Sequence, residues 1–419
     1  LLFNAGTTVV LQLLKKKKNY YYKPNNMISI SNLVFRMKKN AVGLATIAIL
    51  SSMVLVTLVG AASIYAGKKD YLASATPHDY SVSGNKVDLT STKKLMDDFL
   101  IKTGEQANEE VAVSYLLFGI KNQETNKLTV FTKNERKVVP KSIVLVFSQE
   151  TFKQLTGKEL NLSSNQIALY TKNKTLKTQK SLSIDGKNYQ IHRQLGDFIN
   201  KKIPNIYKII VSDYSYLVVP DIKIFESSMK GTSIAQATYV GVNIKDPTHD
   251  AKKNLDLLDQ IAGEATKQLD SQTTGVPVSY FSANSRYDAE GMVNGFVGGT
   301  FFIGIFLSII FMLGTVLVIY YKQISEGYED RERFVILQKI GLDDLQVKQT
   351  IRKQVLTVFF LPLIFAFIHL AFAYHMISLI VRIIGVLNPD LMLVVTIIVC
   401  GVFFLAYVLV FALTSRSYR

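Results

Sequence analysis

The stretch Tyr320–Leu342, YYKQISEGYEDRERFVILQKIGL, places a dense block of charged residues between two long apolar segments. Segment 293–321, which runs into it, contains no charged residue, and segment 355–381 follows it after a short interval. Charged side chains are costly inside a lipid bilayer, so a charge block between two membrane-length segments has to lie in water. The stretch therefore predicts a membrane protein with a short connection, residues 322–354, at the membrane surface.

The charged part of this stretch has the pattern of an amphipathic helix. Acidic and basic residues are mixed over consecutive positions, which suits a solvated helix face, and apolar residues follow them. Gly341 can end the helix in a left-handed cap, and Asp343 with Gln346 resembles a capping box that starts the next helix. A short rigid helix between two spans suits a lever moved by a cytosolic partner, whereas the alternative interpretation is an ordinary solvated connector. The residues of this candidate coupling surface are Glu329, Asp330, Arg331, Glu332, Arg333, Phe334, Leu337, Ile340 and Gly341.

Four apolar runs dominate the 419-residue chain, whose mean hydropathy is +0.21. They cover residues 42–66, 293–321, 355–381 and 391–413 and are 23 to 29 residues long. About 20 apolar residues are enough for a helix to cross a bilayer. A buried core helix is the alternative for any one run, but four runs of this length predict an α-helical transmembrane bundle with four full spans.

Residues 1–14 form a further apolar stretch, which Lys15–Lys18 follow directly. A signal peptide carries its basic residues before the apolar segment, so this order argues against one. We expect residues 1–41 to be the end of a preceding span followed by a basic cytosolic segment. An internal start at Met27 is the alternative interpretation.

Charge placement predicts how the spans are oriented. Residues 1–41 carry eight basic residues and no acidic residue, which marks this side of the cell membrane as cytosolic. Segment 67–292 is then extracellular, while the 322–354 connection and the tail 414–419 are cytosolic. The net charge of +16 comes largely from segments that flank the membrane, so membrane lipids are the expected partner and nucleic acid is not.

Segment 67–292 predicts a large α/β domain. Asp185-Gly186, between two strand-like runs, is the strongest hairpin signal, and Ser148 with Gly157 brackets a short helix. Longer helices are expected near 93–102 and 250–269. The only cysteine, Cys400, lies in the last apolar run, so the domain has to be held by its own hydrophobic core. The expected strands cover residues 111–120, 127–132, 142–147, 181–184, 189–192, 207–212, 214–219, 237–245 and 276–281.

The chain carries no motif for catalysis. It has no P-loop, no His-Glu-x-x-His zinc motif and no cysteine pair. His369 and His375 lie six positions apart in one apolar run, on opposed sides of a helix, so they are poorly placed to share a metal. A more ordinary interpretation is that these membrane-embedded polar residues are satisfied inside the bundle or face a pathway. We expect no catalytic, cofactor-binding or metal-binding residues and no enzymatic activity.

Two stretches resemble a known protein family. Residues Met27–Ala45, MISISNLVFRMKKNAVGLA, and Tyr320–Gly341 carry the resemblance, together with the order of the segments. They are similar to the C-terminal part of a Bce-type (bacitracin-export) ABC transporter permease, within the FtsX-like and MacB-like permease group. Members have further spans before this region, and residues 1–14 would end the last of them. The resemblance implies that the earlier spans are on another chain or have been lost.

The resemblance also implies a function in peptide resistance. Such permeases work with a separate ATPase subunit, and often with a sensor histidine kinase, in the plasma membrane of Gram-positive bacteria. They sense and relieve antimicrobial peptides such as bacitracin, acting on the peptide or on its lipid-linked cell-wall precursor target. The 329–340 helix would then be a coupling helix docked on the ATPase, and the extracellular domain would meet the peptide or the lipid.

Two alternatives come from other classes of protein. An extracellular sensor without transport activity would need a cytosolic output domain, for which the 322–354 connection leaves little room. An FtsX-like membrane regulator of cell-wall hydrolases would be expected to carry a smaller extracellular domain than residues 67–292.

Overall fold

The computed structural model describes residues 16, 24–135, 140–205, 211, 213–245, 251–269, 280–339, 344–386 and 388–415, without the side chains of 24–40, 134, 251, 326–355, 357–358 and 415. The chain divides into two units, which we describe separately. The membrane unit comprises residues 1–67 and 297–419, and the large domain comprises residues 68–296.

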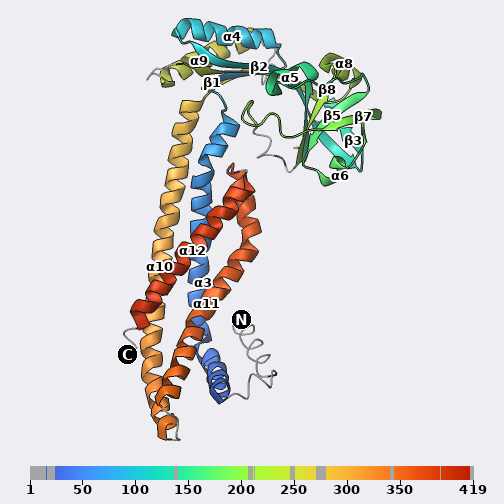
Figure 1. Ribbon diagram of the computed structural model, residues 1–419. Coiled ribbons are helices and arrows are strands. Elements are labelled where there is room, and N and C mark those ends of the chain that lie inside the picture. The colour runs from blue at the N-terminus through green and yellow to red at the C-terminus, as the bar shows by residue number, and fades with distance from the viewer. Residues whose placement is uncertain are drawn as a thin grey trace. The chain divides into compact units, whose positions relative to one another are not determined.

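Four helices in the described part of the chain contain stretches that are long and apolar enough to cross a membrane (Figure 1). These stretches are Ala41–Ala75, Arg286–Ser325, Phe359–Ile383 and Pro389–Thr414. The predicted bundle of four membrane-spanning helices, with a separate α/β domain, is therefore confirmed. The helices are α3 (Pro24–Ala75), α10 (Arg286–Lys339), α11 (Asp344–Ile383) and α12 (Pro389–Ser415).

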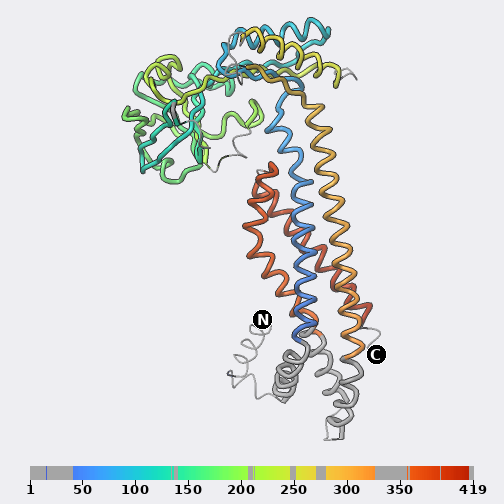
Figure 2. Tube along the Cα trace, turned by 180° about the vertical axis from the view of Figure 1, so that it is seen from behind, coloured from blue at the N-terminus to red at the C-terminus, as the bar shows by residue number. Residues whose placement is uncertain are grey.

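Within the membrane unit, α3 and α10 run side by side in antiparallel order (Figure 2). Gly304 lies so close to α3 that a Cβ added there would be 2.3 Å from the Cβ of Ala61. One turn further along, the hydroxyls of Thr57 and Ser308 are 2.9 Å apart. Small residues let two membrane helices approach closely, and hydroxyl pairs then join them. The facing pairs along the two helices are Tyr65 with Phe301, Ala61 with Gly304, Thr57 with Ser308, Leu50 with Gly314, and Gly43 with Lys322.

Helices α11 and α12 are held together by aromatic side chains instead. The Tyr407 ring packs against the edge of Phe359 with 5.9 Å between ring centroids, and its hydroxyl donates to the Phe359 carbonyl oxygen at 2.9 Å. Asn388 caps α12, because its side-chain oxygen accepts hydrogen bonds from the backbone N–H groups of Asp390 and Leu391. The pair is thus a helical hairpin with an aromatic seam.

The large domain is organised around one ten-stranded sheet in its described residues, in the order β10-β1-β9-β2-β3-β6-β7-β5-β8-β4. Strand β2 also pairs with β4, so the seven strands from β2 to β4 in this order close into a ring. Strands β10, β1 and β9 continue from β2 as an open sheet. The strands are β1 (Tyr80–Asn85), β2 (Ala107–Glu124), β3 (Lys127–Val130), β4 (Ser142–Ser148), β5 (Gln166–Thr171), β6 (Ser181–Ile184), β7 (Lys187–Gln194), β8 (Asp213–Val219), β9 (Ile234–Ile244) and β10 (Tyr280–Ser285).

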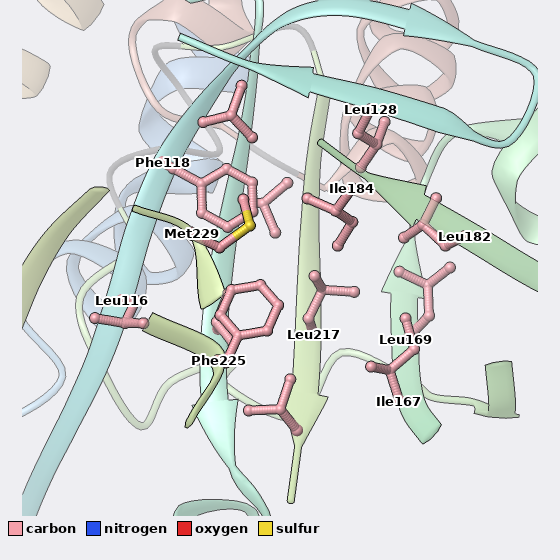
Figure 3. Packing of buried hydrophobic residues seen from close by; sticks show 14 of the residues in the cluster. Leu116, Phe118, Leu128, Ile167, Leu169, Leu182, Ile184, Leu217, Phe225 and Met229 are labelled. Carbon is pink, nitrogen blue, oxygen red and sulfur yellow. The ribbon is translucent and has the colours of Figure 1, made fainter. Parts of the chain in front are cut away.

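The closed ring encloses its own hydrophobic core (Figure 3). Phe118 from β2, Ile184 from β6 and Leu217 from β8 are buried there. Helix α8 (Ile222–Ser228) and the residue after it add Phe225 and Met229 to the same core. The Phe225 ring stacks on Phe118 with 6.4 Å between centroids, so α8 is anchored by burial of its aromatic side chain.

The open sheet is covered on one face by α4 (Leu89–Thr103) and α9 (Ala251–Leu269), as Figure 1 shows. Tyr80, Phe99 and Leu258 are fully buried in the core between them, and the Tyr80 and Phe99 ring centroids are 5.0 Å apart. Asp88 caps helix α4, because its carboxylate accepts from the Ser91 N–H at 2.8 Å. The core of the open sheet is therefore covered by helices, whereas the core of the closed ring is enclosed mainly by strands.

Local signals predicted several of these elements correctly. Ser148 caps α5 (Gln149–Thr156), and Gly157 ends it with a left-handed φ of 71°. Asp185 and Gly186 form the turn between β6 and β7 with φ values of 48° and 83°, as a two-residue hairpin turn requires.

Two strands were not predicted, and others differ in extent. Strand β1 reads YSVSGN and lacks an apolar run, but it pairs with β9 on one edge and β10 on the other. Burial between two neighbours outweighs its weak strand propensity. Strand β5 was also missed, and α6 (Lys174–Lys177) is a further unpredicted element. The expected strands at 207–212 and 276–281 fall mostly outside the described residues, and β10 continues beyond the second.

Candidate functional site

The candidate coupling surface lies on the end of a membrane-spanning helix. The sequence predicts a short separate helix at 329–340, but α10 continues without a break from its apolar stretch to Lys339. The reason lies in composition, because the stretch from Ser325 to Lys339 contains no proline and only one glycine, Gly327, while Glu, Arg and Leu are strong helix formers. The charged end of α10 and its membrane-spanning part therefore belong to one continuous helix.

The individual residues of this surface are placed only by their backbone. Glu329 to Leu337 belong to α10, whereas Ile340, Gly341 and Asp343 lie outside the described residues. Helix α11 begins at Asp344. The proposed contact of these side chains with an ATPase stays a prediction.

The two membrane-embedded histidines of α11 do not come together. His369 Nδ1 lies 3.2 Å from the hydroxyl of Ser52 on α3, and that hydroxyl donates to the Ala48 carbonyl at 2.7 Å. The Ser52 hydroxyl proton is already donated to Ala48, so this oxygen can only accept a hydrogen bond from His369. The hydrogen bond therefore requires the tautomer in which His369 Nδ1 carries the proton. The side chains of His369 and His375 are both exposed on the four described helices rather than enclosed by them. The hydrogen bond joins α3 to α11.

Among the described residues, no group of three or more His, Cys, Asp or Glu side chains is placed to hold a metal ion. Cys400 is a free thiol, partly buried in α12.

Arg286, the first residue of α10, ties together the chain segments at the open end of the sheet. Its backbone N–H donates to the Asp79 carbonyl at 2.9 Å, and its guanidinium bonds the carboxylate of Asp79 at 3.3 Å. It also donates to the carbonyls of Thr76, at 3.1 Å, and Pro77. The two segments that enter and leave the domain, 76–80 and 285–286, are thus held by one planar group.

We call Arg286 and its hydrogen-bond partners Thr76, Pro77 and Asp79 the clamp. Beside this clamp, His78 is 4% exposed and its Nδ1 lies 2.8 Å from the Tyr239 hydroxyl. Burial lowers the pKa of His78 from 6.5 to about 4, and the Arg286 charge acts in the same direction, against Glu109 and Asp79. The ring is therefore neutral at physiological pH. Burial likewise raises the pKa of Tyr239, so the His78–Tyr239 pair is a neutral hydrogen bond.

Sequence reasoning missed both the clamp and the His78–Tyr239 pair. Arg286, Asp79 and Tyr239 are far apart in the chain, and no spacing rule connects them. The usable signal was an arginine at the junction of a strand and an apolar run. The resulting joint fixes the two strands, β1 and β10, whose chain continues into the helices α3 and α10.

These features define a class of protein. The chain is an α-helical membrane protein whose described residues form four candidate spans, with one large α/β domain between the first and second of them.

The chain is similar over most of its length to ABC transporter permeases of Bacillus subtilis (strain 168). It is 23% identical over 379 residues to the ABC transporter permease protein YxdM, covering 88% of this chain and 55% of that protein. It is 21% identical over 383 residues to the bacitracin export permease protein BceB, covering 89% and 54%. It is 21% identical over 406 residues to YvcS, an ABC transporter permease described as uncharacterised, covering 95% and 58%. The resemblance predicted from the two sequence stretches is confirmed.

The chain thus spans somewhat more than half the length of the curated relatives it matches. No family model matches it. A solved structure of a candidate lipoprotein from Bacillus anthracis aligns with 43% of this chain and 92% of its own at 11% identity, with a TM-score of 0.24.

Proposed function

We propose that this chain is a permease subunit of an ATP-driven ABC transporter for antimicrobial-peptide sensing and resistance. The observation that supports it is the order of elements, one span, a large domain and three closing spans, in a chain that aligns over 88 to 95% of its length with three ABC permeases. One of these relatives is a bacitracin export permease. The transporter acts on the peptide or on its lipid-linked cell-wall precursor target.

ATP hydrolysis takes place in a separate ATPase subunit, because the sequence contains no P-loop. The end of α10 supplies the contact with that subunit through its mixed charges and the apolar residues Phe334 and Leu337. A sensor histidine kinase is a further partner in the same membrane. Earlier spans, on this or another polypeptide, complete the permease.

The orientation follows from charge. The basic residues of 1–41 lie in the cytosol, which places the end of α10 on the ATPase side and the large domain outside the cell. The organism is a Gram-positive bacterium. Labelling of a cysteine at Ser183 in intact cells, but not of one at Ser325, would agree with this orientation. The reverse pattern would overturn it.

The function is tested by expressing the whole locus, including the ATPase gene, in a Gram-positive host that lacks its own peptide-resistance transporter. We expect the minimal inhibitory concentration of bacitracin or a lantibiotic to rise several-fold, and to fall back when this chain or the ATPase is deleted. Resistance that survives deletion of the ATPase would exclude an ABC transporter mechanism. No resistance to any tested peptide would exclude the proposed substrate class.

The coupling contact is tested separately with Phe334→Asp. An unpaired charge buried at an interface costs about 2–5 kcal/mol, so the variant should lose ATPase co-purification and resistance while still inserting into the membrane. Phe334→Leu keeps an apolar side chain and is the matched control. Equal ATPase recovery with Phe334→Asp and with the parent would make this stretch a solvated connector.

A further inference from the structure

A pocket of about 180 Å³ opens beside α8 on the closed ring of the large domain. Its apolar walls come from β7, β8 and α8 and are formed by Tyr189, Val219, Pro220, Ile224 and Phe225. Phe225 is only 3% exposed and belongs to the ring core shown in Figure 3, so this wall is anchored in the core. Ile224 is 66% exposed and forms an apolar rim.

The pocket has few polar groups: the neutral hydroxyls of Ser164, Tyr189 and Ser228, and one carboxylate, that of Asp221. Asp221 contributes a carboxylate, one oxygen of which caps α8 by accepting from the backbone N–H groups of Lys223, at 2.7 Å, and Ile224, at 3.1 Å. Ser228 adds a hydroxyl that donates to the Phe225 carbonyl at 2.7 Å and lies 3.4 Å from the Tyr189 hydroxyl. These bonds fix the pocket wall, and the Asp221 side chain lies at the solvent-exposed edge.

We propose that this pocket binds one bulky apolar side chain of a cationic peptide, with an amino group of the peptide beside the Asp221 carboxylate. This proposal rests on the proposed function and names the part of the large domain that recognises the peptide. Its size fits one side chain, because an apolar cavity of about 150 Å³ holds a benzene molecule. Its chemistry follows the usual division in ligand sites, in which apolar walls supply affinity and a few polar groups supply orientation.

The same charge argues against the lipid-linked precursor as occupant. The phosphates of such a lipid are anionic, and a carboxylate at the pocket edge repels them. No basic side chain is among the residues that line the pocket. Of the two ligands that the proposed function allows, the pocket therefore favours the peptide.

Binding can be followed directly, because the chain contains no tryptophan. In the full-length Ile224→Trp variant in detergent, the single indole would report on the pocket rim. We expect nisin, a cationic lantibiotic, or bacitracin to shift its emission to shorter wavelength in a saturable way. The matched control is Ile101→Trp, since Ile101 on α4 is also an exposed isoleucine, 78% exposed, outside the pocket. An equal shift in both variants, or none with either peptide, would overturn the proposal.

Two substitutions in the Ile224→Trp background distinguish the contribution of the Asp221 charge to peptide binding from that of the apolar walls. Asp221→Asn keeps a good helix cap but removes the charge, and should weaken peptide binding by up to about fivefold and reduce its salt dependence. Ser228→Phe fills the pocket and should weaken binding more than about tenfold. Asp88→Asn makes the same change at the cap of α4, outside the pocket, and should leave binding unchanged.

The outcomes distinguish this proposal from the proposed function. Mixed micelles of detergent and phosphatidylcholine carrying a polyprenyl pyrophosphate provide the competing ligand, and a saturable shift with these micelles but not with the peptides would assign the pocket to the lipid instead. If the locus confers resistance that Ser228→Phe and Asp221→Asn leave unchanged, the pocket is not the recognition site although the transporter function stands. If the locus confers no resistance while the peptides still bind at the pocket, the transporter function fails and the binding site stands.

Discussion

The two halves of the large domain bury their cores by different means. The closed ring surrounds its core with paired strands and takes in only the short helices α6 and α8, whereas the open sheet of β10, β1 and β9 relies on α4 and α9 to cover it. Closure removes exposed strand edges, while the open half keeps β1 and β10 for the connections to the membrane-spanning helices. The pocket lies on β7, β8 and α8, so ligand recognition and membrane attachment occupy different ends of one strand order. We expect the two halves to respond separately to damage.

Phe99→Ala in the open half is expected to have the largest effect. Phe99 is fully buried between α4 and the sheet, and removing a buried phenyl ring costs about 3–5 kcal/mol. Hydrogen–deuterium exchange on the full-length protein should show lost protection in α4, β1 and β10, with β5, β6 and β8 largely unaffected. Ile101→Ala on the same helix should cost less than about 0.5 kcal/mol. Equal loss of protection in the ring would mean that the halves unfold as one unit.

Leu217→Ala in the ring is the reciprocal experiment. Leu217 is fully buried in β8, so its truncation should cost about 2–5 kcal/mol. Protection should be lost in β5, β7 and β8 and kept in α4 and β1. Gln190→Ala, at an exposed position of β7, is the matched control and should leave the exchange pattern as in the parent. A ring that keeps its protection would show that its closure tolerates a cavity.

Lowering the pH should weaken the open half at the His78–Tyr239 pair. The pKa of His78 is about 4 in the folded protein and 6.5 without burial, so the fold favours the neutral ring. The stabilisation of the fold by this neutral ring is fully present above pH 6.5 and is lost as the pH falls toward 4. The free energy of unfolding falls by roughly 3 kcal/mol at most over this range. Thermal unfolding of the parent should therefore be more pH-dependent in this window than that of His78→Gln. Identical pH profiles would mean that His78 is solvated.

The smallest effect is expected at the start of α4. Asp88 caps the helix through the Ser91 N–H, so Asp88→Ala should cost about 1 kcal/mol, and Asp88→Asn only a few tenths. The measurement is again hydrogen exchange, confined to the first turn of α4. A large loss in both variants would assign Asp88 a role beyond capping.

Much of the membrane unit and the local turns could be predicted from the sequence. The apolar runs exceed the length of a bilayer span, and Asp185-Gly186 has the residues that a tight hairpin needs. Closure of the ring could not be predicted, because it depends on the pairing of β2 with β4, which no local pattern records. Strand β1 was missed for the same reason, since its serine-rich sequence becomes a strand only between β9 and β10.

The candidate sites divide in the same way. The charged stretch at 329–339 is visible in the sequence because its composition contrasts with the apolar runs beside it. Its continuity with the span was not predicted, since a charged segment can either extend a helix or end it. The pocket residues Tyr189, Asp221 and Ile224 come from separate segments and meet only through the ring topology. Of these three, only Tyr189 was assigned to an element from the sequence, the expected strand 189–192, and α8 was not predicted.

The close seam between α3 and α10 limits the motions available to the membrane unit. Gly304 faces Ala61, and the neighbouring levels hold the Thr57–Ser308 hydroxyl pair and the Tyr65–Phe301 stack. Sliding one helix along the other by a turn, about 5.4 Å, would bring Ala61 against Ser308 or Phe301. Both are larger than glycine and would force the backbones apart. Piston-like travel of one helix against the other is therefore disfavoured, and the pair should tilt or bend as a single rod.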